Sequence, residues 1–502
     1  MEITIENYYK NESEILEDIN KCDFIGFDLE LSGLFPTYES FIDEIEERFL
    51  KLRKIALKYN IIQVGLVFFF KSEKNSFVAK PYNFYVFPSD EIDKNIGMEI
   101  EALNFNKNHG CDFNKWIIKG IPYLNEDELK KLCDKKLNFN INQYNPKNKM
   151  KKIILHKEND KKIYNEITKI FDEFYNSNSN ELKIEKIQRH ILIYFLNNLS
   201  EEIRNKIFIE ENNKNFILIK KVSNEEKVKK INFENEKIFN KIKHEKGIKI
   251  LFEKIIEKKK KIVGHNCLVD ILFIYNNFIE TIPKDFNIFL MKLLNNFNEI
   301  YDTKFLCCYY NKNNINENDF HLEGLYLKLF QEFKDKINIK IHEKFFNYFD
   351  NENKKFHQAD YDALVTGCAF IYMNEKYGKD FVKNNKNKLN LIKSIFVCMN
   401  LNDCKYDELK DDANNVLVIN NINNPEIASK IPEFEKEQFI SKKYYLSKEN
   451  LSIYLIKTKS PQELPSILQL YKSKALPIST LKEYKSTIIN NNNKNINNIN
   501  NI

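Results

Sequence analysis

Two acidic side chains in the segment FIGFDLELSGLF are the first residues whose types and spacing suggest chemistry. Asp28 and Glu30 lie two positions apart on a predicted strand, so both side chains point to the same face. Neighbouring buried carboxylates repel each other and lose their hydration, which is costly unless a divalent cation binds them. The spacing therefore indicates a metal site, although two solvated acids on an edge strand would give the same pattern.

Three more polar residues occur in two later motifs. The segment IVGHNCLVD ends in Asp270, in the first turns of a predicted helix that follows a strand. The segment HQADYD holds His357 and Asp362, which one continuous helix would turn apart by about 140°. They can converge only if His357 lies in the loop before the helix and Asp362 lies within it. A capping Asp or a core His is the alternative for each residue alone, but the three motifs in this order are hard to explain as coincidence.

This order resembles the signature of the DEDD exonuclease superfamily, in the type whose third motif carries a histidine (DEDDh). Longer stretches resemble the poly(A)-specific ribonuclease (PARN) branch of deadenylases over residues 20–380, and more loosely to residue 420. The element GIPYLN is the most specific, because simpler DEDD nucleases have nothing like it. The stretches that carry the resemblance are IDEIEERFLKLRKIALKYNIIQVGLVFF, YNFYVFP, HGCDFNKWIIKGIPYLN, VGHNCLVD, YDTK and HQADYDALVTG.

The resemblance implies 3′→5′ hydrolysis of single-stranded RNA, with preference for poly(A) tails and release of 5′-AMP. By motif position, two Mg²⁺ ions about 3.5–4 Å apart would be held by Asp28, Glu30, Asp270 and Asp362. One ion would lower the pKa of the attacking water and the other would stabilise the departing 3′ oxygen. His357 would orient and deprotonate the water, a task that suits a group titrating near neutrality.

The resemblance also assigns RNA-binding residues where the motifs match. Ser32 and Leu34, just after the DxE strand, and Phe113 fall where family members line the adenine path, and Phe113 is suited to stacking on a base. Lys304 in YDTK matches a family lysine near the phosphates. Asn266 in VGHN is placed to bond a ribose or phosphate. The alternatives are core packing for Phe113, a lone surface lysine at Lys304 and a turn-bracing role for Asn266.

An α/β framework must position these residues. Apolar runs rich in β-branched and aromatic residues predict strands at Phe24–Leu29, Ile61–Phe70 and Tyr82–Phe87. Three- and four-residue apolar periodicity predicts helices at Phe41–Tyr59, Leu268–Phe278, Leu322–Phe333 and Ala359–Tyr377. Together with the resemblance, this pattern predicts an α/β fold, an RNase H-like DEDD exonuclease core with a mixed central sheet flanked by helices.

Domain boundaries follow from spacing and composition. Asp270 follows Asp28 much later than a simple nuclease fold needs, so an insertion is expected. We predict a discontinuous nuclease domain at 1–155 and 246–390. The insertion, 160–245, resembles the family's small α+β R-three-H domain followed by a charged linker, although the Arg189–His190 pair lacks the three spacer residues of that motif. Residues 391–485 resemble an RNA-recognition-like α+β module, and the Asn-rich residues 486–502 are predicted to be disordered.

The single tryptophan bears on partners. In the family, a Trp of the C-terminal RNA-recognition-like domain stacks on the 5′ cap of the message. Here the only Trp is Trp116, inside the nuclease segment, so cap binding is not expected unless Tyr444, Tyr445 or Tyr454 takes its place. The resemblance further implies poly(A) RNA as partner and homodimerisation through the nuclease domain.

Composition excludes several classes of protein. The 502 residues are 43% apolar and 30% charged, with a net charge of +6, which is typical of a soluble protein with several domains and hints only faintly at an anionic partner. The longest apolar run, Ile61–Phe70, is too short to span a bilayer, and no secretory signal is visible. Nine cysteines without a CxxC pair predict neither a disulfide framework nor a zinc site.

Three functions remain after these exclusions. The first is a Mg²⁺-dependent deadenylase of the nucleus, the cytoplasm or both. The second is an exonuclease that trims the 3′ ends of small non-coding RNAs with the same site. The third is a non-catalytic RNA-binding scaffold that has kept the fold.

Overall fold

The computed structural model divides by its contacts into two compact units. The first contains Met1–Pro88, Lys94–Tyr123 and Ile248–Ile502, and the second contains Ser89–Asp93 and Leu124–Gly247. The residues that the structure describes are 1–34, 43–73, 75–137, 155–185, 187–212, 216–311, 321–345, 357–392, 394, 398–402, 416–419, 427, 440–448, 451–458, 462, 464–473, 477–484 and 486.

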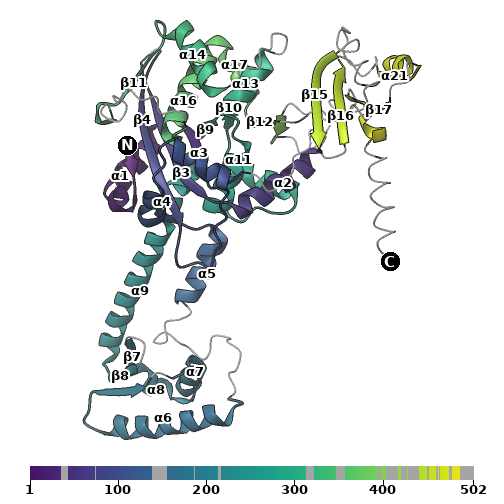
Figure 1. Ribbon diagram of the computed structural model, residues 1–502. Coiled ribbons are helices and arrows are strands. Elements are labelled where there is room, and N and C mark those ends of the chain that lie inside the picture. Colours follow the sequence, from purple (N-terminus) through teal and green to yellow (C-terminus); the bar gives the residue numbers. More distant parts are fainter. Residues whose placement is uncertain are drawn as a thin grey trace, which may run out of the picture. The chain divides into compact units, whose positions relative to one another are not determined.

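A mixed sheet forms the centre of the first unit (Figure 1). Its main path runs β1-β4-β3-β2-β9-β10, and β5 and β11 also pair with β4. The strand β2 is antiparallel to β3 and parallel to β9, so the sheet is mixed, as predicted. The strands are β1 Glu2–Ile3, β2 Phe24–Leu31, β3 Ile61–Glu73, β4 Ser76–Pro88, β5 Ile121–Tyr123, β9 Lys261–Gly264, β10 Ile300–Asp302 and β11 Asn338–Ile341.

Helices cover the sheet through two apolar clusters. One cluster joins Ile25, Phe27 and other strand residues to α1, α2, α10, α11 and α12, and the other joins Phe24 and Phe69 to α13, α14, α16 and α17. Because successive strand residues point to opposite faces, β2 contributes to both clusters. The helices are α1 Ile5–Lys21, α2 Ile45–Lys58, α3 Ile100–Asn108, α4 Phe113–Lys119, α10 Lys249–Glu257, α11 Leu268–Ile274, α12 Phe286–Asn296, α13 Thr303–Tyr310, α14 Leu322–Phe333, α16 Ala359–Lys376 and α17 Lys379–Asn384.

Two predicted helices differ from the observed ones at their ends. The helix expected over Leu268–Phe278 ends as α-helix at Ile274 and continues as a π-helical turn, Tyr275–Ile279. The helix expected from Phe41 begins at Ile45, and residues 41–42 lie outside the described residues. The apolar periodicity of a π-helical turn differs too little from that of an α-helix to be recognised in five residues.

The second unit is built on two helices that pack against each other, α5 Glu126–Leu137 and α9 Asn224–Lys246. The same unit contains a three-stranded antiparallel sheet of order β6-β8-β7, which has its own apolar core. Its elements are β6 Glu181–Glu185, β7 Ile207–Asn212, β8 Phe216–Lys221, α6 Glu158–Asn176, α7 Arg189–Asn198 and α8 Glu201–Asn205. The unit begins earlier along the chain than the insertion predicted at 160–245, because α5 belongs to it. The domain boundaries remain predictions.

Besides the short segment Ser89–Asp93, the chain leaves the first unit after Tyr123 and returns to it at Ile248. The two crossing points are adjacent, because the Ile248 N–H donates to the Pro122 carbonyl at 3.3 Å.

The C-terminal part of the first unit contains a short hairpin and a separate sheet. The hairpin strands are β12 Lys388–Asn390 and β13 Cys398–Asn400. The sheet is antiparallel, of order β15-β16-β14-β17, and Tyr445 is in register with Tyr454. Its elements are β14 Val416–Ile419, β15 Ile440–Lys448, β16 Leu451–Thr458, β17 Ile478–Thr480 and the helix α21 Leu464–Ser473. Residues 487–502 of the predicted tail lie outside the described residues.

Across the described ranges, the structure contains no helix that is both long enough and apolar enough to pass through a bilayer.

Candidate active site

The strand β2 and the helix α16 bring the first and third motifs together. Alternation along β2 places Gly26, Asp28 and Glu30 on the face that α16 covers. A Cβ atom at Gly26 would lie 2.5 Å from the Ala363 carbonyl oxygen, and one at Gly65, the β3 partner of Asp28, would lie 2.0 Å from the Ala359 carbonyl oxygen. Only glycine allows so close an approach, so the first turn of α16 lies directly on the two strands.

Three carboxylates meet at this crossing. Oxygen atoms of Asp28, Glu30 and Asp362 all lie within 4.8 Å of one another. The helix begins at Ala359, so Asp362 lies in its first turn and His357 precedes it, the arrangement that their spacing requires. The His357 backbone N–H donates to Asp362 Oδ2 at 3.1 Å.

The fourth acid, Asp270, comes from the neighbouring strand. The strand β9 runs parallel to β2, and a short turn leads from its end into α11, which carries Asp270 in its first turn. The Asp270 charge raises the pKa of both Asp28 and Glu30, so the four acids share one electrostatic site.

Burial and mutual repulsion disfavour the charged forms of these acids. Burial, and then the Asp362 and Asp270 charges, hold the pKa of Asp28 and of Glu30 well above the usual range. Burial raises the pKa of Asp270 to about 7, and also that of Asp362, although backbone N–H groups partly oppose both shifts. Without a cation, burial and repulsion therefore favour the protonated forms of these acids.

The donor set fits a divalent cation. Asp362 Oδ1 is buried and has no hydrogen-bond partner among the described residues, so one oxygen of the group is available to a cation. Mg²⁺ prefers carboxylate oxygens and needs few of them, because it keeps several waters. These residues therefore suit Mg²⁺ chemically.

His357 lies at the rim of the site beside two residues that sequence reasoning did not single out. Its ring is exposed, and it contacts the rings of His109 and Phe105 at centroid distances of 4.4 and 5.0 Å. Burial and then His109 lower the pKa of His357, while Glu323 acts in the opposite direction. The motif HGCDF includes His109, but nothing in its sequence links His109 to the distant His357.

A pocket of about 490 Å³ opens beside the carboxylates. Glu30, Asp270, Leu34 and Asn266 line it, together with apolar side chains that include Phe105, Val269 and Ile392. Two of the predicted RNA-binding residues, Leu34 and Asn266, thus share a pocket with two of the acids.

Ser32 is fully buried behind this pocket. Its hydroxyl donates to the Gly97 carbonyl at 2.7 Å and accepts the Asn60 N–H at 2.9 Å, so in this structure it braces the chain that leads to Leu34.

Phe113 and Lys304 do not line the pocket. Phe113 is half-buried and lies edge-on to Trp116, with ring centroids 6.2 Å apart. Trp116 itself is buried, and its indole N–H donates to the Ile61 carbonyl at 3.2 Å. The lone tryptophan is therefore a core residue. The side chains of Tyr444, Tyr445 and Tyr454 lie outside the described part of the chain.

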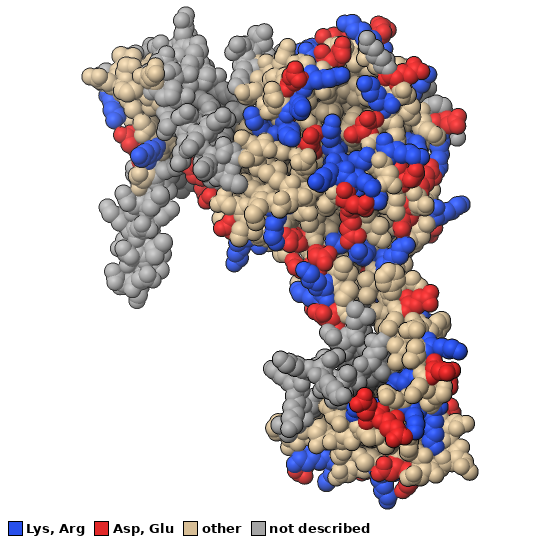
Figure 2. Space-filling view, turned by 180° about the vertical axis from the view of Figure 1, so that it is seen from behind, with Lys and Arg blue, Asp and Glu red and all other residues tan. Residues whose placement is uncertain are grey.

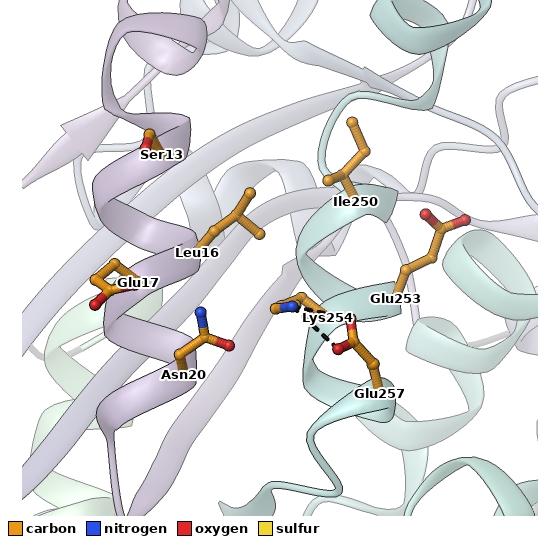
Figure 3. Close-up of a pocket in the computed structure, with 8 residues that line it drawn as sticks. All are labelled: Ser13, Leu16, Glu17, Asn20, Ile250, Glu253, Lys254 and Glu257. Carbon is orange, nitrogen blue, oxygen red and sulfur yellow. Dashed lines mark hydrogen bonds and ion pairs between the residues drawn. The ribbon is translucent and has the colours of Figure 1, made fainter.

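Neither the distribution of surface charge nor a second pocket in the first unit points to another part of the active site. On the face seen in Figure 2, the Lys and Arg side chains are interspersed with Asp and Glu rather than segregated, in keeping with the small net charge. A second pocket, of about 440 Å³, lies between α1 and α10 and shares no residue with the first (Figure 3). It combines Leu16 and Ile250 with an ion pair of Lys254 and Glu257.

Comparisons with known proteins agree with the motifs. A family profile described as CAF1 family ribonuclease matches residues 3–370. The poly(A)-specific ribonuclease PARN of Xenopus laevis is 25% identical over 417 residues, which cover 76% of this chain and 64% of that protein. The pre-piRNA 3′-exonuclease trimmer of Bombyx mori is 28% identical over 415 residues, which cover 78% of this chain and 75% of that protein. The chain thus spans less than two thirds of the length of the Xenopus protein.

Among solved structures, that of S. pombe Pop2p in a Mg²⁺- and Mn²⁺-bound form is 13% identical, with a TM-score of 0.35. It covers 75% of this chain and 92% of that chain, and a likeness this weak supports no inference.

Proposed function

Because the chain belongs to the CAF1 family of ribonucleases, we propose that it is a Mg²⁺-dependent 3′→5′ exoribonuclease that shortens poly(A) tails and releases 5′-AMP. The convergence of four acids from three distant motifs is the observation that carries this proposal. Without a cation, four buried acids this close together destabilise the folded state. Carboxylates are also the ligands that hold the metal ions in two-metal hydrolysis of phosphodiesters. The name of the Xenopus relative supports poly(A) as the substrate.

Each residue of the site has a proposed role. Asp28, Glu30, Asp270 and Asp362 would hold two Mg²⁺ ions, which when bound supply a water of low pKa and stabilise charge on the departing oxygen. His357 orients the attacking water and accepts its proton. The lowered pKa of His357 keeps its ring neutral, and therefore basic, at pH 7.

The pocket beside the acids suits the 3′-terminal nucleotide. Leu34 and Phe105 offer apolar surface to a base, and Asn266 lies in the same wall as Asp270. Ser32 would act by supporting the chain before Leu34, Phe113 by stacking on a base farther along the RNA, and Lys304 by contacting a phosphate. The family resemblance supports a homodimer and action in the nucleus, the cytoplasm or both. It also supports an RNase H-like core with R-three-H-like and RNA-recognition-like modules.

Digestion of 5′-labelled RNA tests this function directly. Oligo(A) with Mg²⁺ should shorten one nucleotide at a time from the 3′ end, with 5′-AMP as the product. EDTA should stop the reaction. Endonucleolytic fragments, or an absence of AMP release, would refute the proposal, and RNA binding without hydrolysis would favour the scaffold.

A second candidate function is trimming of small non-coding RNA 3′ ends. The similarity to the Bombyx trimmer favours it, since that protein matches over a larger share of its own length than the Xenopus ribonuclease does. Oligo(A) and oligo(U) of equal length separate the two candidates. A tail-shortening enzyme degrades oligo(A) much faster, whereas a general trimmer degrades both at similar rates.

A further inference from the structure

A buried aspartate organises the turn that leads to Asp270. Asp302, at the end of β10, is fully buried and accepts backbone N–H groups from three separate segments. Its Oδ1 accepts those of Asn266, Lys304 and Phe305 at 2.9, 2.9 and 3.2 Å. Its Oδ2 accepts those of Cys267 and Asn390 at 3.3 and 2.9 Å. One carboxylate thus joins the turn after β9, the start of α13 and the hairpin strand β12.

The turn that Asp302 holds has a strained backbone. Asn266 has a φ of 56°, in the left-handed region that non-glycine residues rarely adopt. Such a conformation persists only when the surrounding contacts fix it. Four residues later the chain reaches Asp270, so the conformation at Asn266 determines where the first turn of α11 begins.

The amide of Asn390 supplies the other contact to this turn. Its Nδ2 donates to Asn266 Oδ1 at 2.8 Å, while its backbone N–H donates to Asp302. Asn390 is 8% exposed, and Ile392, two residues on, lines the pocket beside Asp270. Asn390 therefore contacts Asn266 through its side chain and Asp302 through its backbone, and it does so from a hairpin that follows the nuclease motifs in the sequence.

We propose that Asn390 is a positioning residue for the reaction. Through Asn266 and Asp302 it holds the left-handed turn, and thereby places Asp270 against Asp28 and Glu30. This proposal rests on the proposed function, because Asn390 affects cation binding and turnover only indirectly and does not contact the RNA. Small displacements of a ligand are costly, since catalysis depends on the geometry of the bound groups.

Asn390→Ala tests the proposal, because it removes the side-chain donor and keeps the backbone N–H that Asp302 accepts. We expect kcat to fall roughly 3- to 10-fold, the effect of one hydrogen bond, with little change in KM for oligo(A). The Mg²⁺-induced increase in Tm, measured without RNA, should become smaller at a fixed subsaturating Mg²⁺ concentration.

A double-mutant cycle in kcat shows whether Asn390 acts on the reaction through Asn266 or independently of Asn266. Asn390→Ala and Asn266→Ala should be non-additive, so that the double variant is no slower than the slower single variant. The matched control is Asn400→Ala in the same hairpin, because the Asn400 side chain accepts the Asn402 N–H at 3.1 Å and does not contact Asn266 or Asp302 within the described residues. This variant should leave kcat unchanged.

Three results would overturn the proposal. They are a kcat of Asn390→Ala equal to that of the wild type, additive effects in the cycle, or an unchanged Mg²⁺-induced shift in Tm. Circular dichroism and the Tm in EDTA identify a variant that fails to fold, in which case the milder Asn390→Ser, which also removes the amide donor to Asn266, should show the smaller Mg²⁺ shift. An inactive wild type would refute the proposed function, while the Mg²⁺ shift would still decide the role of Asn390.

Discussion

At the scale of single residues, the four acids oppose folding of the cation-free protein. Their raised pKa values mean that burial and repulsion disfavour the charged forms. Stability in EDTA and activity in Mg²⁺ should therefore respond in opposite directions when one acid is neutralised.

Asp28→Asn should abolish AMP release, lowering kcat by at least about 100-fold, because it removes one of the proposed metal ligands. In EDTA at pH 8 the same variant should be more stable than the wild type by on the order of 1 kcal/mol, because a neutral amide avoids the cost of burying an acid whose pKa is raised. Urea unfolding and the AMP assay check both effects. The exposed Asp335→Asn is the control and should change neither. Retained activity in Asp28→Asn would contradict the site.

The pH dependence of stability follows from the same pKa shifts. In the unfolded chain these acids titrate near their ordinary values of about 4, whereas in the folded chain Asp270 and Asp362 titrate at about 7. Between these values the folded state binds more protons, so its stability in EDTA falls as pH rises from about 4 to 7. Mg²⁺ competes with those protons, so its stabilising effect should grow over the same range.

Thermal unfolding at pH 5.5 and pH 8, with and without Mg²⁺, measures this linkage. The Mg²⁺-induced rise in Tm should be larger at pH 8. A larger rise at pH 5.5 would mean that the acids are already ionised in the free protein, contrary to their predicted crowding.

At the scale of elements, the crossing of α16 over β2 and β3 sets the position of Asp362. A methyl group at Gly65 would overlap the Ala359 carbonyl, so Gly65→Ala must push the helix start away from the strand. We expect a loss of roughly 1–3 kcal/mol in unfolding free energy, together with a several-fold higher Mg²⁺ requirement for activity.

Val64→Ala on the same strand serves as the matched control. Val64 points into the other apolar cluster, so its truncation should reduce stability by about 1 kcal/mol or more and leave the Mg²⁺ requirement unchanged. If both variants change the Mg²⁺ requirement equally, the helix crossing is not what places Asp362.

Sequence reasoning was strongest where a residue acts within its own element. The strand that carries Asp28 and Glu30 and the helix start between His357 and Asp362 follow from local patterns, and the structure contains both. The contacts of Asp302 and Asn390 could not be predicted, because they join segments far apart in the chain by hydrogen bonds that leave no periodic signature. Asp302 had one readable sign, since an Asp before a helix is a typical N-cap, whereas Asn390 had none.

At the scale of the whole molecule, we predict that a 5′ cap has little effect on turnover. Trp116 is buried in the nuclease unit and therefore unavailable for stacking. We expect a 5′ cap on a poly(A) RNA to change kcat/KM by less than about 2-fold, since no tryptophan offers it a stacking surface. Capped and uncapped RNAs of identical sequence provide the comparison, and a large increase with the cap would implicate the tyrosines of β15 and β16.

The adjacent crossing points at Pro122 and Ile248 have an evolutionary consequence. The hydrogen bond between these residues lies within the first unit, so the chain leaves that unit and re-enters it at one place. A lineage could gain, exchange or lose everything between them in a single genetic event without moving any of the four acids. Divergence of substrate choice among descendants can therefore be concentrated in that segment, while the hydrolytic chemistry is inherited unchanged.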